Sequence, residues 1–359
     1  MQRNYCLDIR LGSAAAARIR DRGWSADIFG GMIGASGGPK WLILSHIDRV
    51  LADVVIAGRT RPLTMVGSSI GAWRHAMLAQ SDPRAAIDRF ESAYLQQHYV
   101  SEKPSVAEIT AVSRAILDQA LPEAELAPLV SHPFLHSLIV TARARGCAAA
   151  HSKAPVALGF GLAALGNILS RQTLSWSFQR VVFSAQRERQ LPELLRGFST
   201  DYQSLSVSNV KTALMATGAI PGVLAPQRDI DGVQPGCYWD GGIIDYHFDT
   251  DGLSQDTLWL YPHFSSAMAT GWFDKFLPWR AGRIARASSL VHLAPTPAFL
   301  SRLPFGKIPD RRDFERLDVE QRRRYWRQCV DMGQYLAEDL RALWQGSDPL
   351  DGVIVAESY

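Results

Sequence analysis

The sequence has little cysteine, no long apolar run and no excess of charge of either sign. Acidic and basic side chains nearly balance, with 35 Asp and Glu against 38 Lys and Arg, which gives no basic footprint for a nucleic acid. The four cysteines show neither C-x-x-C nor Cys/His metal spacing and are too few for a secreted disulfide framework: Cys6, Cys147, Cys237 and Cys329. We therefore expect no metal, no cofactor and no nucleic-acid partner.

The sequence also lacks the marks of membrane insertion and secretion. Its longest apolar stretch, residues 154–169, falls short of the roughly 20 residues that a membrane-spanning helix needs. Residues 1–24 contain an alanine run, but charged side chains interrupt every apolar stretch, so the apolar core of a signal peptide is missing. We expect no transmembrane segment and a cytoplasmic location. The 154–169 stretch fits two alternatives, a mobile cap over an apolar site and a buried helix.

Strand and helix patterns alternate along the chain. Nearly half of the residues are apolar, enough for a large core, and we expect a single domain over residues 1–359 with a helical extension at about 310–345. The alternation predicts an α/β fold, a three-layer α/β/α sandwich with a mostly parallel central sheet. The expected elements are strand-turn-helix units over 26–56 and 62–80, helices at 83–98, 104–120 and 318–344, and strands near 135–142, 178–184, 257–261 and 289–293.

Two short segments fit the nucleophile-elbow pattern Gly-x-Ser-x-Gly: "GASGG" at 34–38 and "GSSIG" at 67–71. The strained turn of an elbow needs small residues two before and two after the serine, and both segments satisfy this. A serine hydrolase also needs backbone N–H donors for an oxyanion, which a glycine turn at a helix N-terminus provides. Gly37 and Gly38 stand before a helix opened by Pro39. Lys40 opposes the dipole of that helix, so we expect it to have a partner.

The assignment that uses both segments makes 34–41 the oxyanion loop and 67–71 the elbow. Ser69 is then the nucleophile, flanked by the small residues Gly67 and Gly71, and Ser36 is not. The N–H of Ile70 would join those of Gly37 and Gly38 in the oxyanion hole. A lone Gly-x-Ser-x-Gly can also be a simple small-residue turn.

A third segment, residues 210–249, contains an apolar helix, a turn framed by prolines and then Asp240-Gly241-Gly242. An aspartate at a strand end followed by two glycines places a carboxylate on a turn that another backbone can approach. The alternative is an Asp-Gly turn that closes a hairpin.

The order of these three pieces resembles the patatin-like phospholipase family, over about residues 26–250. In that family a glycine-rich loop carrying Lys or Arg precedes Gly-x-Ser-x-Gly and then Asp-Gly-Gly or Asp-Gly-Ala. The resemblance implies that Ser69 is the nucleophile and Asp240 the catalytic aspartate, supported by Gly241 and Gly242. It assigns Gly37, Gly38 and Lys40 to the oxyanion motif. The chain departs from the pattern in having Ser36 and Trp41 where the family loop usually has its outer glycines.

The function implied by the resemblance is hydrolysis of a lipid acyl ester, of the phospholipase A or lysophospholipase type, by a Ser-Asp dyad without a metal. A Ser-Asp-His triad of the α/β-hydrolase type is an alternative, with His247, His263 or His292 as its third member. We expect each of these to be a surface or capped histidine instead. A catalytically silent lipid-binding protein and an acyltransferase are further alternatives.

A cluster of aromatics and cations at 271–283, "GWFDKFLPWRAGR", suits the interface of a bilayer. It indicates a peripheral membrane contact. The alternative is a loop whose aromatics, Trp272 and Phe273 among them, pack into the core.

Overall fold

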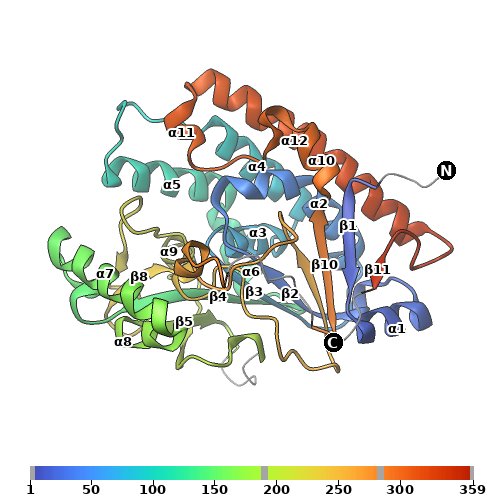
Figure 1. Cartoon of the computed structure of the whole chain (residues 1–359), viewed down its shortest axis with the longest axis horizontal. Coiled ribbons are helices and arrows are strands. Elements are labelled where there is room, and N and C mark those ends of the chain that lie inside the picture. Colours follow the sequence, from blue (N-terminus) through green and yellow to red (C-terminus); the bar gives the residue numbers. More distant parts are fainter. Residues whose placement is uncertain (1–4, 187–192, 281–286, 356–359) are drawn as a thin grey trace.

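The computed structural model describes residues 5–186, 193–280 and 287–355, and its strands join in one large mixed sheet (Figure 1). The strands are β1 Leu7–Leu11, β2 Phe29–Gly34, β3 Leu63–Ser68, β4 Leu135–Ala144, β5 Phe178–Ser184, β6 Thr200–Ser204, β7 Gln227–Arg228, β8 Cys237–Asp240, β9 Leu258–Pro262, β10 Leu290–Pro295 and β11 Ile354–Val355.

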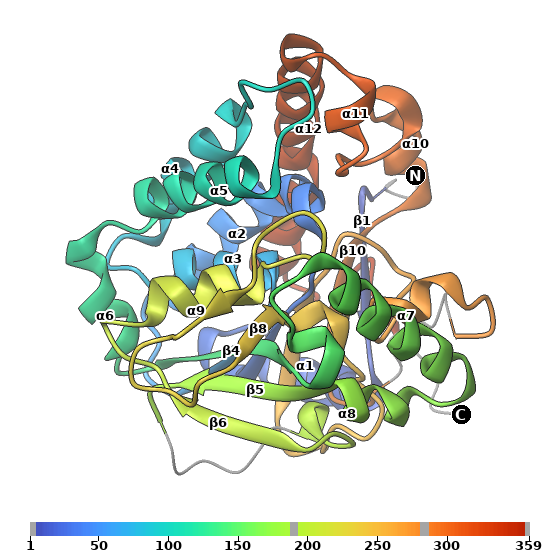
Figure 2. The same ribbon diagram turned by 90° about the vertical axis from the view of Figure 1, so that its left-hand side faces the viewer.

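The α-helices connect and cover these strands. They are α1 Ser13–Arg22, α2 Ser45–Leu51, α3 Ile70–Leu78, α4 Pro83–Gln96, α5 Val106–Ala120, α6 Leu126–Val130, α7 Lys153–Leu169, α8 Leu174–Ser177, α9 Val210–Thr217, α10 Pro297–Arg302, α11 Asp313–Arg316 and α12 Val319–Gln345. In Figure 2, α3, α4, α5, α9 and α12 lie on one side of strands β4, β5 and β6. Helix α1 packs against β1, and α8 packs against β5.

The centre of the sheet is parallel. Strands β10, β9, β2, β3 and β4 follow one another in that order and all pair in parallel, as expected for apolar strands covered on both faces. Antiparallel pairs stand on either side, β1 with β10 and β4 with β5. The prediction of an α/β fold with a mostly parallel sheet flanked by helices is confirmed. Strand β1 is an addition to the predicted strands, none of which begins before residue 26.

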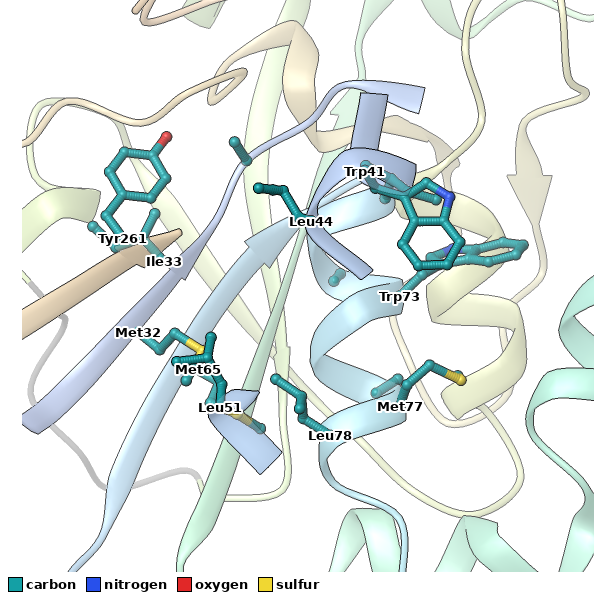
Figure 3. Packing of buried hydrophobic residues seen from close by; sticks show 14 of the residues in the cluster. Met32, Ile33, Trp41, Leu44, Leu51, Met65, Trp73, Met77, Leu78 and Tyr261 are labelled. Carbon is teal, nitrogen blue, oxygen red and sulfur yellow. The ribbon is translucent and has the colours of Figure 1, made fainter. Parts of the chain in front are cut away.

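One predicted helix is wound differently from the expectation. The stretch after the glycine turn forms a 3₁₀ helix at Gly38–Leu44, then α2, then a π-helical turn at Ala52–Ile56. The side chains of residues 41–44 are all buried, because α3 and α12 both pack against this turn. Packing from several sides, more than helical propensity, therefore sets its winding. Figure 3 shows Trp41 and Leu44 of this turn beside Trp73 of α3.

Close backbone contact between β2 and α3 brings the first two glycine segments together. A Cβ atom on Gly71 would lie 2.1 Å from the carbonyl oxygen of Gly34, so no side chain fits there without a backbone shift. The two Gly-x-Ser-x-Gly segments therefore touch through their glycines, although about thirty residues separate them in sequence.

We expect Gly71→Ala to lower the free energy of unfolding by about 2–3 kcal/mol, because the new methyl group overlaps backbone atoms that cannot move freely. The matched control is Gly161→Ala in α7, where a Cβ meets nothing within 4 Å. There the gain in helix propensity should leave stability unchanged or raise it by up to about 1 kcal/mol. Urea denaturation of both variants measures the difference, and equal midpoints would contradict the tight contact.

Candidate active site

Ser69 occupies a strained turn between β3 and α3. Its backbone has φ 52° and ψ −131°, a region that side-chain-bearing residues rarely adopt. Such strain gathers at functional sites. A Cβ atom on Gly67 would lie 2.7 Å from the backbone nitrogen of Ala72. The small residues that the elbow pattern predicts on both sides of the serine are therefore required by the backbone of this turn.

Strand β4 brings the elbow and the Asp-Gly-Gly turn together. The last residue of β3, Ser68, pairs with Val140 of β4, and the last residue of β8, Asp240, pairs with Thr141. Strand β8 is antiparallel to β4 and β3 is parallel to it, so their carboxyl ends meet at adjacent β4 residues. A Cβ atom on Gly241 would lie 2.1 Å from the carbonyl oxygen of Val140. Asp240 closes no tight hairpin of its own; its turn faces the elbow.

The hydroxyl of Ser69 donates a hydrogen bond to the carboxylate of Asp240. The Ser69 Oγ to Asp240 Oδ2 distance is 2.9 Å, and the other carboxylate oxygen accepts from the N–H of Gly242 at 2.7 Å. Both side chains are buried, with 5% and 6% of their surface exposed. The Gly242 bond therefore fixes the carboxylate and directs its second oxygen at Ser69.

Burial raises the pKa of Asp240 from 3.8 to about 6. The hydrogen bonds from Gly242 and Ser69 oppose this rise, as do the positive charges of Arg311 and Lys275. A carboxylate with a pKa near 6 is still ionised at neutral pH, and it is a stronger base than an exposed aspartate. The environment thus moves Asp240 toward the range that suits a general base.

Ser36, the serine of the first glycine segment, makes structural hydrogen bonds. Its Oγ lies 2.7 Å from the Oγ of Ser68, which in turn donates to the carbonyl of Asp245 at 2.6 Å. Because the Ser68 proton is used in that bond, Ser36 is the donor to Ser68. Its backbone N–H donates to the carbonyl of Tyr246. Ser36 therefore ties the glycine loop to the elbow and has no hydrogen bond to Asp240.

The glycine loop turns its backbone toward Ser69. Gly37 and Gly38 line the same pocket as Ser69, and no residue that the structure describes accepts a backbone hydrogen bond from Gly37, Gly38 or Ile70. Gly38 has φ 56°, and a Cβ on Gly37 would lie 2.5 Å from the ring of Phe264. Both positions thus need glycine.

The departure from the family loop at position 41 has a simple explanation. Trp41 points into the core, where its ring stacks on Phe90 with centroids 4.3 Å apart and only 1% of its surface is exposed. The bulky side chain therefore leaves the pocket free. Lys40, next to it, has the expected partner, since its Nζ lies 4.8 Å from the ring centroid of Phe264. Burial lowers the pKa of Lys40.

Sequence reasoning missed Thr217, at the end of α9. Its hydroxyl accepts from the backbone N–H of Ser69 at 2.9 Å and donates to the carbonyl of Val140. It therefore holds the elbow to β4. The only sequence signal was its position just before the Gly218 and Pro221 turn, which marks a helix end but no partner.

One pocket collects the three segments singled out in the sequence. Its lining comprises Ser36, Gly37, Gly38, Ser69, Asp240 and Gly242 from those segments, together with Ile220, Pro221, Ile243, Tyr246, Trp272 and Arg311. The wall is thus mainly apolar, and its polar groups converge on Ser69. Arg311 comes from far along the chain, and no local pattern in the sequence pointed to it.

The three candidate histidines lie together in the core, so the expectation of surface positions is wrong. His247 and His263 have ring centroids 4.4 Å apart, and His292 lies 5.7 Å from His263. Burial lowers the pKa of all three. The expectation of capping holds for His247, which accepts from the N–H of Ala269, and for His263, which bonds the backbone of Ser265. None lines the pocket or hydrogen-bonds to Ser69 or Asp240, and the arrangement favours a dyad.

The 271–283 cluster contains both packed and exposed aromatics. Phe273 is buried and Trp272 lines the pocket, so these two aromatics belong to the core. Phe276 and Trp279 are largely exposed, at 68% and 66%. Residues 281–283 lie outside the described part of the chain.

The fold is α/β. In its candidate site, a serine on a strained strand-to-helix turn hydrogen-bonds to a buried aspartate in a glycine-lined pocket. The family model described as patatin-like phospholipase matches residues 49–247. The chain belongs to the patatin-like phospholipase family, and membership implies a lipid acyl hydrolase. No curated protein matches the chain in sequence.

Two solved structures show a distant likeness. VipD from Legionella pneumophila is 12% identical, with 99% of this chain and 76% of that chain covered and a TM-score of 0.31. The ExoU–SpcU complex from Pseudomonas aeruginosa gives 15% identity, with 89% and 53% covered and a TM-score of 0.30. TM-scores this low do not establish a shared arrangement of the whole chain.

Within the described ranges, no group of three or more His, Cys, Asp or Glu side chains is arranged to hold a metal ion. Over the same residues, no helix combines the length and the apolarity that crossing a bilayer requires.

We expect Asp240→Asn to raise the melting temperature by a few degrees at neutral pH. The amide oxygen still accepts from the N–H of Gly242, its NH2 group donates to Ser69 Oγ in place of the bond that the carboxylate accepted, and no charge is buried. The ionised carboxylate costs roughly 3 kcal/mol, from a pKa of about 6 in the fold against 3.8. Because the folded-state pKa is the higher one, this cost is complete above about pH 6 and absent below 3.8. Calorimetry should show the advantage of the variant shrinking between these values. A pH-independent difference would contradict the raised pKa.

Proposed function

We propose that the protein hydrolyses lipid acyl esters, in the manner of a phospholipase A or lysophospholipase, with Ser69 as nucleophile and Asp240 as general base. The observation that carries the proposal is the 2.9 Å hydrogen bond from Ser69 to a buried, oriented carboxylate in a glycine-lined pocket. Ser69 Oγ attacks the ester carbonyl carbon while its proton passes to Asp240. The tetrahedral intermediate then expels the alcohol, which takes the proton from Asp240.

Water completes the cycle at the same carboxylate. Asp240 accepts a proton from water as it attacks the acyl-enzyme, and the acid is released when Ser69 Oγ leaves and regains that proton. The N–H groups of Gly37, Gly38 and Ile70 form the oxyanion hole in this proposal, because they have no described acceptor and flank the pocket or Ser69.

The remaining motif residues support the dyad and the glycine loop. Gly67, Gly71 and Gly241 allow close backbone approach, Gly242 orients the carboxylate, and Lys40 adds positive charge behind the loop.

Ser69→Ala should abolish hydrolysis of a nitrophenyl ester, because it deletes the attacking atom. Ser36→Ala is the matched control: it removes a buried hydroxyl of the same pocket without touching the Ser69–Asp240 bond. It should retain most of the activity and lose some stability. If Ser36→Ala alone abolished turnover, the assignment of the two glycine segments would be reversed.

Asp240→Asn should reduce kcat by several orders of magnitude, since the amide cannot accept the serine proton. In the wild type, kcat/KM should rise with pH up to about 6 and then level off, falling about tenfold per pH unit on the acid side. A variant of His247, His263 or His292 that kept its melting temperature but lost as much activity would favour a triad instead.

Positive charge near the pocket supports a substrate with an anionic group. Arg311 lines the pocket, and a Cβ on Gly38 would lie 3.6 Å from its Cγ. Lys275 sits behind Tyr246, with its Nζ 3.3 Å from the ring centroid. Burial and the charges of Lys40 and Arg311 lower the pKa of Lys275 to about 6. An anion in the pocket would restore its full charge.

None of Lys40, Lys275 and Arg311 forms an ion pair with a described residue, and the nearby Asp310 is bound by Lys307 at 3.1 Å. Asp240 acts on Arg311 and Lys275 only through its charge. A cluster in which basic groups outnumber the nearby carboxylate suits the phosphate of a phospholipid or lysophospholipid.

We expect Arg311→Ala to lower kcat/KM for a lysophospholipid by about 10- to 100-fold, the loss of one charge-assisted contact. Hydrolysis of a neutral monoacylglycerol should change much less. Arg312→Ala is the control, because Arg312 is the next residue, exposed and outside the pocket. Equal losses on both substrates would contradict a headgroup role.

A further inference from the structure

Helix α7 exposes its most apolar face to the outside. Leu158, Leu162, Leu165, Ile168 and Leu169 are between 46% and 85% exposed, and their spacing of three and four residues places them on one side of the helix. The opposite side packs against the protein. There, a Cβ on Gly159 would lie 2.4 Å from the backbone of Ala148, and Asn167 donates to Asp274 at 2.9 Å.

Neighbouring aromatic side chains accompany this face. Helix α7 contacts α8 and the 3₁₀ helix Phe273–Phe276. Trp176 of α8 is 78% exposed, and Phe276 and Trp279 are the exposed aromatics of the 271–283 cluster. Figure 2 shows α7 at the periphery of the molecule. We call the five α7 residues with Trp176, Phe276 and Trp279 the α7 surface. The five α7 residues share one helix face, and an exposed apolar face of this kind marks an interaction site.

The sequence on both sides of α7 contains basic side chains and no acidic ones. No aspartate or glutamate occurs between Glu125 and Glu188. Arg145 and Lys153, which precede and begin α7, are exposed. An apolar helical face next to exposed cations complements a bilayer that carries anionic lipids.

The inner side of α7 is joined to the pocket. Its residues Val156, Phe160 and Ala163 pack in one cluster with Ile243 and Trp272, and these last two line the pocket of Ser69. The α7 surface and the pocket are therefore separated by a single apolar wall. A bilayer seated on α7 would lie next to the site that takes its acyl chains.

We propose that the α7 surface docks the protein on an anionic lipid bilayer, with α7 lying in the plane of the interface. The inference rests on the proposed function for the identity of the partner, since a lipid substrate brings this pocket to a bilayer. At 17 residues, α7 is too short to span a membrane, which takes about 20. Burial of its leucines among acyl chains would drive binding, and Arg145 and Lys153 would add attraction to anionic headgroups.

The test measures vesicle binding in the Ser69→Ala background, so that no hydrolysis alters the lipids. Leu162→Glu with Leu165→Glu should weaken binding to phosphatidylcholine–phosphatidylserine vesicles by about tenfold or more, because two inserted apolar side chains become charged. Both positions are exposed and glutamate favours helices, so the melting temperature should not change. Val100→Glu with Val207→Glu is the control, made at exposed valines outside the α7 surface, and should bind like the parent.

A second pair of variants tests the charge. Arg145→Ala with Lys153→Ala should reduce binding to vesicles with phosphatidylserine and leave the weaker binding to pure phosphatidylcholine unchanged. Vesicle binding that is equal in the parent and in the Leu162 and Leu165 variant would overturn the proposal. A dimer that the parent protein forms with rising concentration, and that only the Leu162 and Leu165 variant fails to form, would also overturn the proposal. The surface would then bind a second copy of the chain.

The docking proposal and the proposed hydrolase function can fail independently of each other. With Ser69 intact, the Leu162 and Leu165 variant should hydrolyse a soluble nitrophenyl ester at the parent rate. Lipid binding that depends on α7 in a protein without esterase activity would overturn the proposed function and leave the docking surface standing. Esterase activity in a protein whose vesicle binding does not depend on α7 would overturn the docking surface and leave the proposed function standing.

Discussion

The geometry of the site depends on strand β4, which pairs with the ends of two other strands. Ser68 and Asp240 are held opposite the adjacent residues Val140 and Thr141, so the elbow and the Asp-Gly-Gly turn cannot separate without breaking the ladder. Thr217 adds a hydrogen bond to each side of this junction. The 2.9 Å contact between Ser69 and Asp240 is therefore a property of the sheet, and a pair held in this way is preorganised.

The residues gathered at this junction lower the stability of the fold. The junction combines a serine with positive φ, a buried carboxylate with a raised pKa and a lysine, Lys275, whose pKa burial lowers to about 6. Each feature opposes stability, and together they concentrate in one pocket. The surrounding parallel strands and the buried turn of Trp41 supply the packing that tolerates them.

Local pattern predicted most of the fold and the centre of the site. The central strands and the long helices follow from apolar periodicity, and Ser69, Asp240 and the glycine loop follow from motifs in which spacing reflects geometry. What the sequence could not predict depends on distant contacts. Arg311 and Thr217 reach the pocket or the elbow only through the tertiary fold. The burial of the histidines did have a local signal, since His292 stands inside the apolar strand Leu290–Pro295. For residues 154–169 the sequence left a mobile cap and a buried helix open. The stretch forms α7, with one face packed and the other exposed, and which face is covered depends on its tertiary neighbours.

The most direct test of the Ser69–Asp240 assignment is to locate the covalent adduct of a fluorophosphonate probe by peptide mass spectrometry. The probe reacts with a serine that is activated by a base, so the adduct should lie on Ser69 in the wild type and form far more slowly in the Asp240→Asn protein. An adduct on Ser36 or on another serine would contradict the account. So would modification of Ser69 at the same rate with and without the carboxylate of Asp240.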